Sequence, residues 1–234
     1  GEGAEGTCSL AISGNKIEGE LSDNLIVKAY RMLSADHILP HINFNLEKHI
    51  PSQAGLGGGS SDATYSLRLL NKLCQLNLNS ATLHQYAVRL GADCAFFVTA
   101  TPAFATGIGD ILEPMNAECA HLHGMYLLIV KPTVAISTAQ AFVFVKPQPT
   151  LIKCKDIVAQ PVNSEWRNHL TNNFEVSAFK LHPEMHTIKE QLYNMGALYA
   201  QMSGSGSAFF GIFNTPPTLT ANHFNGMFTY LCQL

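Results

Sequence analysis

The sequence predicts a globular protein of two domains that contain both helices and strands. Its length of 234 residues is enough for two modest domains, each with its own core. A strand pattern, a glycine-rich loop and a helix pattern follow one another over residues 42–74. A helix pattern and two strand patterns around a second glycine-rich turn occupy residues 183–213. We expect a boundary near residue 120, giving domains at 1–120 and 121–234.

Composition excludes several classes of protein. Hydrophobic residues make up 47% of the chain and charged residues 13%, which is typical of a compact protein and not of a disordered or fibrous one. The net charge of -3 gives no general attraction to nucleic acid or to an anionic membrane, so we expect neither partner. The longest apolar runs, such as residues 125–130, are too short to span a membrane.

Six cysteines are scattered along the chain without a CxxC motif or a close Cys/His spacing. This pattern argues against a structural zinc site and against a disulfide framework. We therefore expect reduced thiols in a cytoplasmic protein. The ten histidines also lack metal-ligand spacing, so none is a candidate for catalysis or metal binding.

The first predicted elements lead into the glycine-rich loop. Asp23 is expected to cap a helix over residues 23–34, where apolar residues recur at helical spacing. Residues 42–47 alternate between apolar and polar side chains, the pattern of a strand with one buried face. After the loop, apolar residues over 63–74 recur on one face of a helix.

The following elements complete the first domain. A helix over residues 80–90 should end at Gly91, the residue type that most readily adopts a left-handed C-cap. Residues 94–98 are apolar enough to be buried, and residues 102–114 are expected to form a turn-rich return.

The second domain has weaker patterns at its start and stronger ones at its end. We expect a strand over 125–131, a short helix from a Ser137 cap through Phe144, and a connecting loop over 146–163. Pro183 is suited to the first position of a helix that ends near Gly196. The expected strands 197–202 and 208–213 flank a turn over 203–207.

The loop from Gly55 to Ser61 carries the clearest functional signal. Glycines lack a Cβ atom, so backbone N–H groups can approach a phosphate closely, and the following helix adds its unpaired N–H groups and dipole. The loop matches neither the P-loop nor the dinucleotide fingerprint. A flexible linker is the alternative, but a linker has no reason to lie between a strand and a helix.

Several motifs resemble a known superfamily. Residues 51–63, PSQAGLGGGSSDA, resemble the second signature of the galactokinase, homoserine kinase, mevalonate kinase and phosphomevalonate kinase (GHMP) superfamily, and GSGSA at 204–208 resembles its third. DNLIVKA at 23–29, LGADC at 90–94 and ATGIGD at 105–110 resemble the 4-diphosphocytidyl-2-C-methyl-D-erythritol kinases within it. The resemblance runs from about residue 20 to the end of the chain.

The resemblance implies an α+β, two-domain GHMP kinase fold, with an N-terminal domain like domain 2 of ribosomal protein S5 and a ferredoxin-like C-terminal domain. It also implies ATP-dependent phosphorylation of the 2-hydroxyl of 4-diphosphocytidyl-2-C-methyl-D-erythritol in non-mevalonate isoprenoid biosynthesis. ATP and Mg²⁺ are the implied cofactors. The implied partner is the small-molecule substrate, a cytidine diphosphate-linked methylerythritol, and the protein is expected to be a monomer or weak homodimer.

The same resemblance assigns roles to individual residues. Asp93 becomes the catalytic and substrate-contacting carboxylate, although by spacing alone it is an ordinary loop residue after a helix. Thr138 and Phe142 become substrate contacts, although Phe142 on a short helix is by default a core residue. The implied nucleotide-binding residues are Asn24, Lys48, Gly55, Leu56, Gly57, Gly58, Gly59, Ser60, Ser61, Asp62, Gly204, Ser205 and Gly206.

Structural alternatives accompany these roles. Ser61 is the implied Mg²⁺ ligand, yet Ser60 or Ser61 could equally serve as an N-cap. Asp62 could simply favour the helix dipole, and Gly204 and Gly206 could simply close a tight turn. Asn24 and Lys48, taken alone, are surface residues at a helix start and a strand end.

One part of the superfamily pattern has no counterpart. The first signature, which supplies a lysine beside the catalytic aspartate and contacts to cytosine, is not found, so N-terminal strands are expected to be missing. If the molecule begins at Gly1, the resemblance implies that it is inactive. We therefore expect the sequence to come from a shortened, a processed or an incompletely observed protein. The alternatives are another GHMP kinase, of homoserine or mevalonate type, or a nucleotide-binding protein without catalysis.

Overall fold

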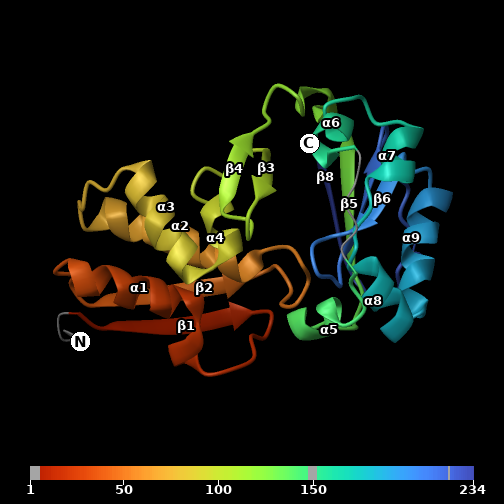
Figure 1. The fold of residues 1–234 in the computed structure, drawn as a ribbon. Helices are drawn as coiled ribbons and strands as arrows, with labels where there is room; N and C mark the ends of the chain where they lie inside the picture. Colours follow the sequence, from red (N-terminus) through yellow and green to blue (C-terminus); the bar gives the residue numbers. More distant parts are fainter. Residues whose placement is uncertain (1–5, 147–151, 221) are drawn as a thin grey trace. The chain divides into compact units, whose positions relative to one another are not determined.

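The computed structural model describes residues 6–146, 152–220 and 222–234. The chain divides into two compact units, shown in Figure 1. Unit 1 comprises residues 1–52 and 57–115, and unit 2 comprises Gln53–Leu56 and residues 116–234. The sequence placed the boundary near residue 120, and no pattern predicted that the start of the glycine-rich loop packs with the second unit.

Unit 1 begins with a parallel pair of strands. β1 (Cys8–Gly14) and β2 (Ile42–Lys48) pair in register, with Leu10 opposite Phe44. Parallel strands need a crossover, and α1 (Leu25–Asp36) supplies it after a short 3-10 turn at Leu21–Asp23. The strand over 42–47 is confirmed with one added residue, whereas β1 was not predicted.

Three helices and a hairpin complete unit 1. They are α2 (Gly58–Leu73), α3 (Ser80–Leu90), α4 (Ala92–Phe96), β3 (Ala103–Thr106) and β4 (Ile111–Pro114). The core of unit 1 forms where α1, α2 and α3 pack together, with Tyr30, Leu33, Leu67 and Leu70 fully buried. The expected turn-rich return is the antiparallel pair of β3 and β4.

Two predictions about helix caps in unit 1 need correction. The N-cap of α1 is Asn24, whose side-chain oxygen accepts a hydrogen bond from the Ile26 N–H, because Asp23 belongs to the preceding 3-10 turn. Gly91 does follow α3, but its φ of 166° is extended backbone and not a left-handed cap. The chain can therefore enter α4 directly after Gly91.

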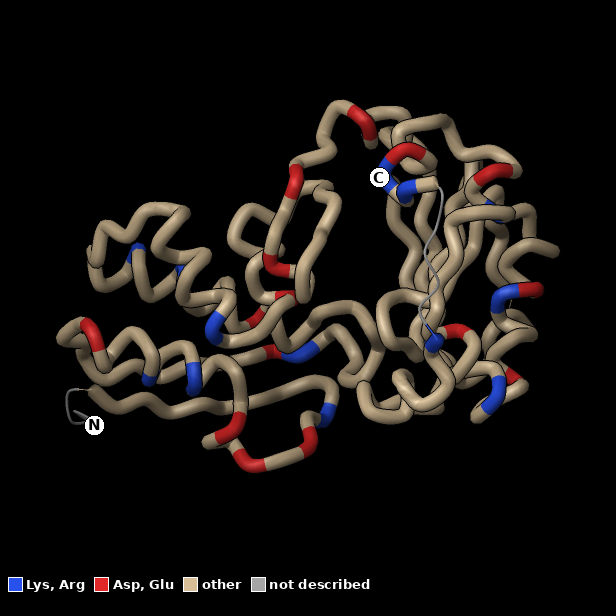
Figure 2. The backbone as a smooth tube through the Cα atoms, in the orientation of Figure 1, with Lys and Arg blue, Asp and Glu red and all other residues tan. Residues whose placement is uncertain are grey.

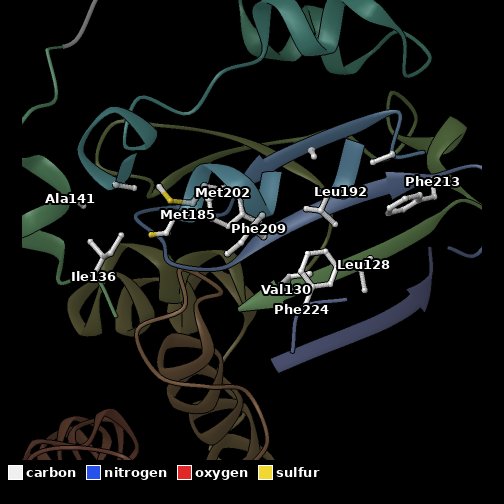
Figure 3. Close-up of a cluster of buried hydrophobic side chains, with 14 residues drawn as sticks. Leu128, Val130, Ile136, Ala141, Met185, Leu192, Met202, Phe209, Phe213 and Phe224 are labelled. Atoms are coloured by element: carbon white, nitrogen blue, oxygen red, sulfur yellow. The ribbon is translucent and has the colours of Figure 1, made fainter. Parts of the chain in front are cut away.

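Unit 2 is built on a four-stranded antiparallel sheet in the order β6-β7-β5-β8. The strands are β5 (Tyr126–Lys131), β6 (Tyr199–Met202), β7 (Phe209–Phe213) and β8 (Phe228–Gln233). Helix α9 (Glu184–Asn194) packs against this sheet through Met185 and Leu192, as Figure 3 shows. Antiparallel strands with helices of this kind agree with the expected α+β class.

The remaining helices of unit 2 are short. They are α5 (Thr138–Phe142), α6 (Cys154–Val158), α7 (Ser164–His169) and α8 (Glu175–Leu181), with a 3-10 turn at Ala120–Leu122. Ser137 caps α5 through a capping box with Gln140, so the predicted cap is confirmed.

Other predictions for unit 2 need correction. The expected loop over 146–163 contains α6, and its Pro147 and Pro149 lie outside the described residues. Pro183 is the N-cap of α9 and not its first helical residue. The turn over 203–207 and the strands on either side of it are confirmed as β6 and β7, but β8 was not predicted.

Charged residues are spread along both units, and each unit carries both basic and acidic positions (Figure 2). None of the helices in the described ranges is long and apolar enough to cross a membrane.

Candidate active site

The N-terminus of α2 is open to an anion. Its N-cap is Gly57, which has no side chain to bond the first N–H groups, whereas Asn24 and Asn79 cap α1 and α3 in that way. The first intrahelical bond of α2 runs from the Ser61 N–H to the Gly57 carbonyl at 2.8 Å. The N–H groups of Gly58, Gly59 and Ser60 therefore precede the helical ladder and can bind phosphate oxygens.

This geometry corrects one reading of the loop. The helix begins at Gly58, inside the expected loop, so Ser60 and Ser61 are first-turn residues and neither of them is the N-cap. Their hydroxyl groups are consequently not needed for capping.

A buried cation lies beside this helix terminus. The Lys48 side chain at the end of β2 is only 5% exposed and forms an ion pair with Asp62. A Cβ atom added to Gly58 would lie 3.1 Å from the Lys48 Nζ atom, so the ammonium group is next to the first turn of α2. Its positive charge adds to the helix dipole, and Asp62 stabilises the buried cation.

Two glycines of the loop differ in what they tolerate. Gly57 has a φ of +64°, and a Cβ atom on it would lie 2.9 Å from the ring of Phe97. Gly59 is helical, and the nearest atom to its added Cβ would be 3.9 Å away on Leu25. The left-handed backbone at residue 57 and the nearby Phe97 ring therefore favour glycine at this position. The contact with Leu25 shows that the start of α1 lies close to Gly59.

Replacing these glycines with alanine should therefore have opposite effects on stability. We expect Gly57→Ala to lower the free energy of unfolding by about 1–3 kcal/mol through left-handed strain and the Phe97 contact. Gly59→Ala should be neutral or stabilising by about 0.5–1 kcal/mol, because alanine favours the helix. Urea unfolding of both variants measures this difference, and equal losses would contradict it.

Asp93 is in an exposed position next to this region of unit 1. It lies in the first turn of α4 and not in a loop, which corrects the reading from spacing. Its carboxylate makes no hydrogen bond or ion pair with the residues that the structure describes. Burial raises the pKa of the adjacent Cys94 thiol, so the neighbouring side chain remains neutral.

In unit 2, the first loop glycine packs against the second glycine-rich turn. A Cβ atom on Gly55, whose φ is +69°, would overlap the Ser203 carbonyl oxygen, and the Ser203 hydroxyl donates to the Gly55 carbonyl at 2.8 Å. The N–H of Ala208 donates to the Ala54 carbonyl at 3.0 Å. Gly204, with a φ of +52°, closes the turn, so this glycine has a structural role that does not depend on binding a ligand.

The two expected substrate contacts lie on α5. Thr138 and Phe142 are both exposed, one turn apart on the helix. Phe142 is 58% exposed and meets the ring of Phe174 edge to face at 4.9 Å, so its default reading as a core residue was wrong.

Sequence patterns missed two groups of supporting residues. In the first group, the hydrogen bond between the Thr64 hydroxyl and the Cys94 carbonyl joins α2 to α4. In the second group, the Asn172 side chain donates to the carbonyls of Met202 at 2.8 Å and Gly204 at 2.7 Å. A threonine among the apolar residues of the buried face of α2 was the available signal for the first group. No local signal marks Asn172, because its partners lie about thirty residues along the chain.

Comparisons with known proteins agree with this arrangement. Residues 24–101 match the GHMP kinases N terminal domain, and residues 154–221 match the GHMP kinases C terminal family. A 4-diphosphocytidyl-2-C-methyl-D-erythritol kinase of Bacteroides fragilis is 46% identical over 222 residues, covering 95% of this chain and 80% of that protein. The protein of the same name from Bacteroides thetaiotaomicron is 48% identical, covering 90% and 76%.

A solved structure gives the same result at the level of the fold. The crystal structure of a 4-(cytidine 5'-diphospho)-2C-methyl-D-erythritol kinase aligns with a TM-score of 0.68 and 30% identity, over 88% of this chain and 75% of that one. The fold class expected from the resemblance is thereby confirmed. The chain belongs to the GHMP kinases and, among them, to the 4-diphosphocytidyl-2-C-methyl-D-erythritol kinase family.

Proposed function

We propose that this protein transfers the γ-phosphoryl group of ATP to the 2-hydroxyl of 4-diphosphocytidyl-2-C-methyl-D-erythritol, a step in non-mevalonate isoprenoid biosynthesis. The observation that carries the proposal is the uncapped, glycine-rich start of α2 with Lys48 beside it, in a chain 46–48% identical to kinases named for this substrate. The geometry of the site supports phosphate binding, and the names of the relatives support the choice of acceptor.

The residues of unit 1 suggest how the reaction would proceed. The N–H groups of Gly58–Ser60 hold phosphate oxygens, and Lys48 neutralises part of their charge. The acceptor oxygen forms a bond to the γ-phosphorus while the bond from that phosphorus to the ADP oxygen breaks. Asp93 orients the acceptor hydroxyl and takes its proton. Positioning and charge stabilisation account for most of the rate enhancement.

Further contacts are proposed for residues of both units. Asn24 keeps its side-chain NH₂ group available for a nucleotide, because only its oxygen caps α1. Thr138 and Phe142 would contact the acceptor, which their exposure permits. The other proposed nucleotide contacts are Gly55, Leu56, Gly57, Asp62, Gly204, Ser205 and Gly206.

Mg²⁺ is proposed as the metal that accompanies ATP. Within the described ranges no three His, Cys, Asp or Glu side chains cluster as a metal site. Mg²⁺ commonly takes substrate phosphates and water together with only one or two protein oxygens, so the residues fit an ion held mainly by the nucleotide. Ser61, half-buried in the first turn of α2, is the proposed protein ligand. When bound, the ion would neutralise charge on the phosphates.

A cytoplasmic location is proposed as well. All six cysteines are free thiols, which is the usual state in a reducing compartment.

The test of the proposal is a comparison of acceptors. With ATP and the full-length gene product, we expect kcat/KM for 4-diphosphocytidyl-2-C-methyl-D-erythritol to exceed that for homoserine or mevalonate by at least about 10⁴-fold, because the site would be built for polar groups those alcohols lack. Production of ADP is the readout, and CDP serves as a control without the acceptor hydroxyl. Equal turnover of mevalonate, or ATP binding by calorimetry with no ADP formed from any acceptor, would contradict the proposal.

A further inference from the structure

A buried polar contact joins α2 to α4. The Thr64 hydroxyl donates a hydrogen bond to the backbone carbonyl of Cys94 at 2.9 Å. Both residues have no exposed surface, so water cannot replace this bond. The accepting carbonyl belongs to the residue that directly follows Asp93 in α4.

Two further contacts lie along the same interface. Burial raises the pKa of the Cys94 thiol, and the neighbouring Ser60 and Thr64 side chains oppose that shift. Gly57 lies against the ring of Phe97 so closely that a Cβ atom would collide with it. The first two turns of α2, which begin at the anion-binding terminus, are therefore packed against the helix that carries Asp93.

A hydroxyl group at position 64 needs an explanation. The buried face of α2 also contains the apolar residues Ala63, Leu67 and Leu70, and burial of an unpaired hydroxyl is unfavourable. Thr64 does not bond to its own helix, whereas Ser66 on α2 donates to the Asp62 carbonyl one turn earlier. The Thr64 hydroxyl is thus used between helices and not within one.

We infer that Thr64 is a positioning residue that, through the Cys94 carbonyl, holds Asp93 at a fixed place relative to the N–H groups of Gly58–Ser60. The inference rests on the proposed function, because it concerns the placement of the proposed base and of the phosphate site. Loss of the bond leaves α4 attached by packing alone, and small displacements of a catalytic group reduce turnover more than they reduce binding.

Thr64→Val tests this because valine keeps the β-branched shape and removes the hydroxyl. In the full-length protein we expect kcat to fall by about tenfold or more while KM for ATP stays within about twofold. Thr64→Ser retains the donor and should restore kcat to within about threefold of the wild type. Ser66→Ala, which removes a buried hydroxyl from the same helix, is the matched control and should leave kcat unchanged.

A double variant separates this inference from the proposed role of Asp93. In an Asp93→Asn background, Thr64→Val should lower single-turnover rates no further, because the group it positions is already gone. An equal loss in both backgrounds would overturn the positioning role and leave the catalytic role of Asp93 intact. A Thr64→Val enzyme with a lower urea midpoint but a normal kcat would also overturn it, since the bond would then be only structural. Normal turnover of Asp93→Asn alone would instead overturn the proposed base.

Discussion

Asp93→Asn should lower kcat by about 10²–10⁴-fold, the usual contribution of a general acid–base group, while KM for ATP changes little. The physical reason is that asparagine has nearly the same shape but cannot accept the proton of the acceptor hydroxyl. Single-turnover assays of the full-length protein measure the chemical step directly. Unchanged turnover would remove Asp93 from the mechanism.

The position of Asp93 makes this substitution a clean test. The carboxylate is exposed and makes no hydrogen bond or ion pair within the described residues, so removal of its charge breaks no structural contact. Asparagine is also well tolerated near helix N-termini, so the urea midpoint should not move. A large loss of stability would mean that the fold, and not the chemistry, depends on this charge.

Asp156→Asn provides the matched control. Asp156 is also an exposed aspartate in the first turn of a five-residue helix, α6, as Asp93 is in α4. The two substitutions remove the same charge from equivalent local settings. We expect Asp156→Asn to retain turnover within about twofold, as surface substitutions away from special features generally do.

The sequence predicts those parts of the fold that depend on local periodicity. β2 and α3 were found because their apolar residues recur at strand or helix spacing over seven and eleven residues. β1 has the same alternation at Leu10 and Ile12 and was overlooked, although its signal was present. Helices α6 and α7 are five and six residues long, and so few residues do not give a distinct period.

The candidate site also has features that the sequence predicts and features that it does not. The glycine-rich start of α2 was predictable, because a phosphate-binding loop needs residues without Cβ atoms beside a helix N-terminus. The pairing of Lys48 with Asp62 was not predictable, because it depends on how the end of β2 meets α2. Nor could sequence alone decide between Asp23 and Asn24 as the cap of α1, since both residue types are good caps and the preceding 3-10 turn decides.

A second group of buried charges supports the end of β6 in unit 2. The Lys189 ammonium group contacts the Glu175 carboxylate at 2.7 Å and the Gln201 side-chain oxygen at 2.8 Å. Glu175 also accepts a hydrogen bond from the Met202 N–H at 3.0 Å, just before the turn over 203–207. The side chains of Lys189 and Glu175 are 20% and 11% exposed, so solvent screens this pair only weakly.

Lys189→Met should therefore lower the free energy of unfolding by about 2–4 kcal/mol, slightly below the range for fully buried pairs because Lys189 is partly exposed. Methionine retains most of the side-chain volume but leaves the Glu175 carboxylate buried without its cation. Lys28→Met is the control, because Lys28 pairs with Asp23 at 46% and 74% exposure and should contribute less than about 1 kcal/mol. Urea unfolding with unchanged m-values measures both effects.

The double variant Lys189→Met/Glu175→Gln identifies the cause of the loss. Glutamine removes the unpaired charge and can still accept from the Met202 N–H, so the double variant should be more stable than Lys189→Met alone. If the penalty came from lost packing of the lysine stem, Glu175→Gln would not restore any stability. Equal shifts for Lys189→Met and Lys28→Met would show that burial does not strengthen the pair. The predicted order of stability, wild type above the double variant and the double variant above Lys189→Met, thus follows from desolvation of one carboxylate.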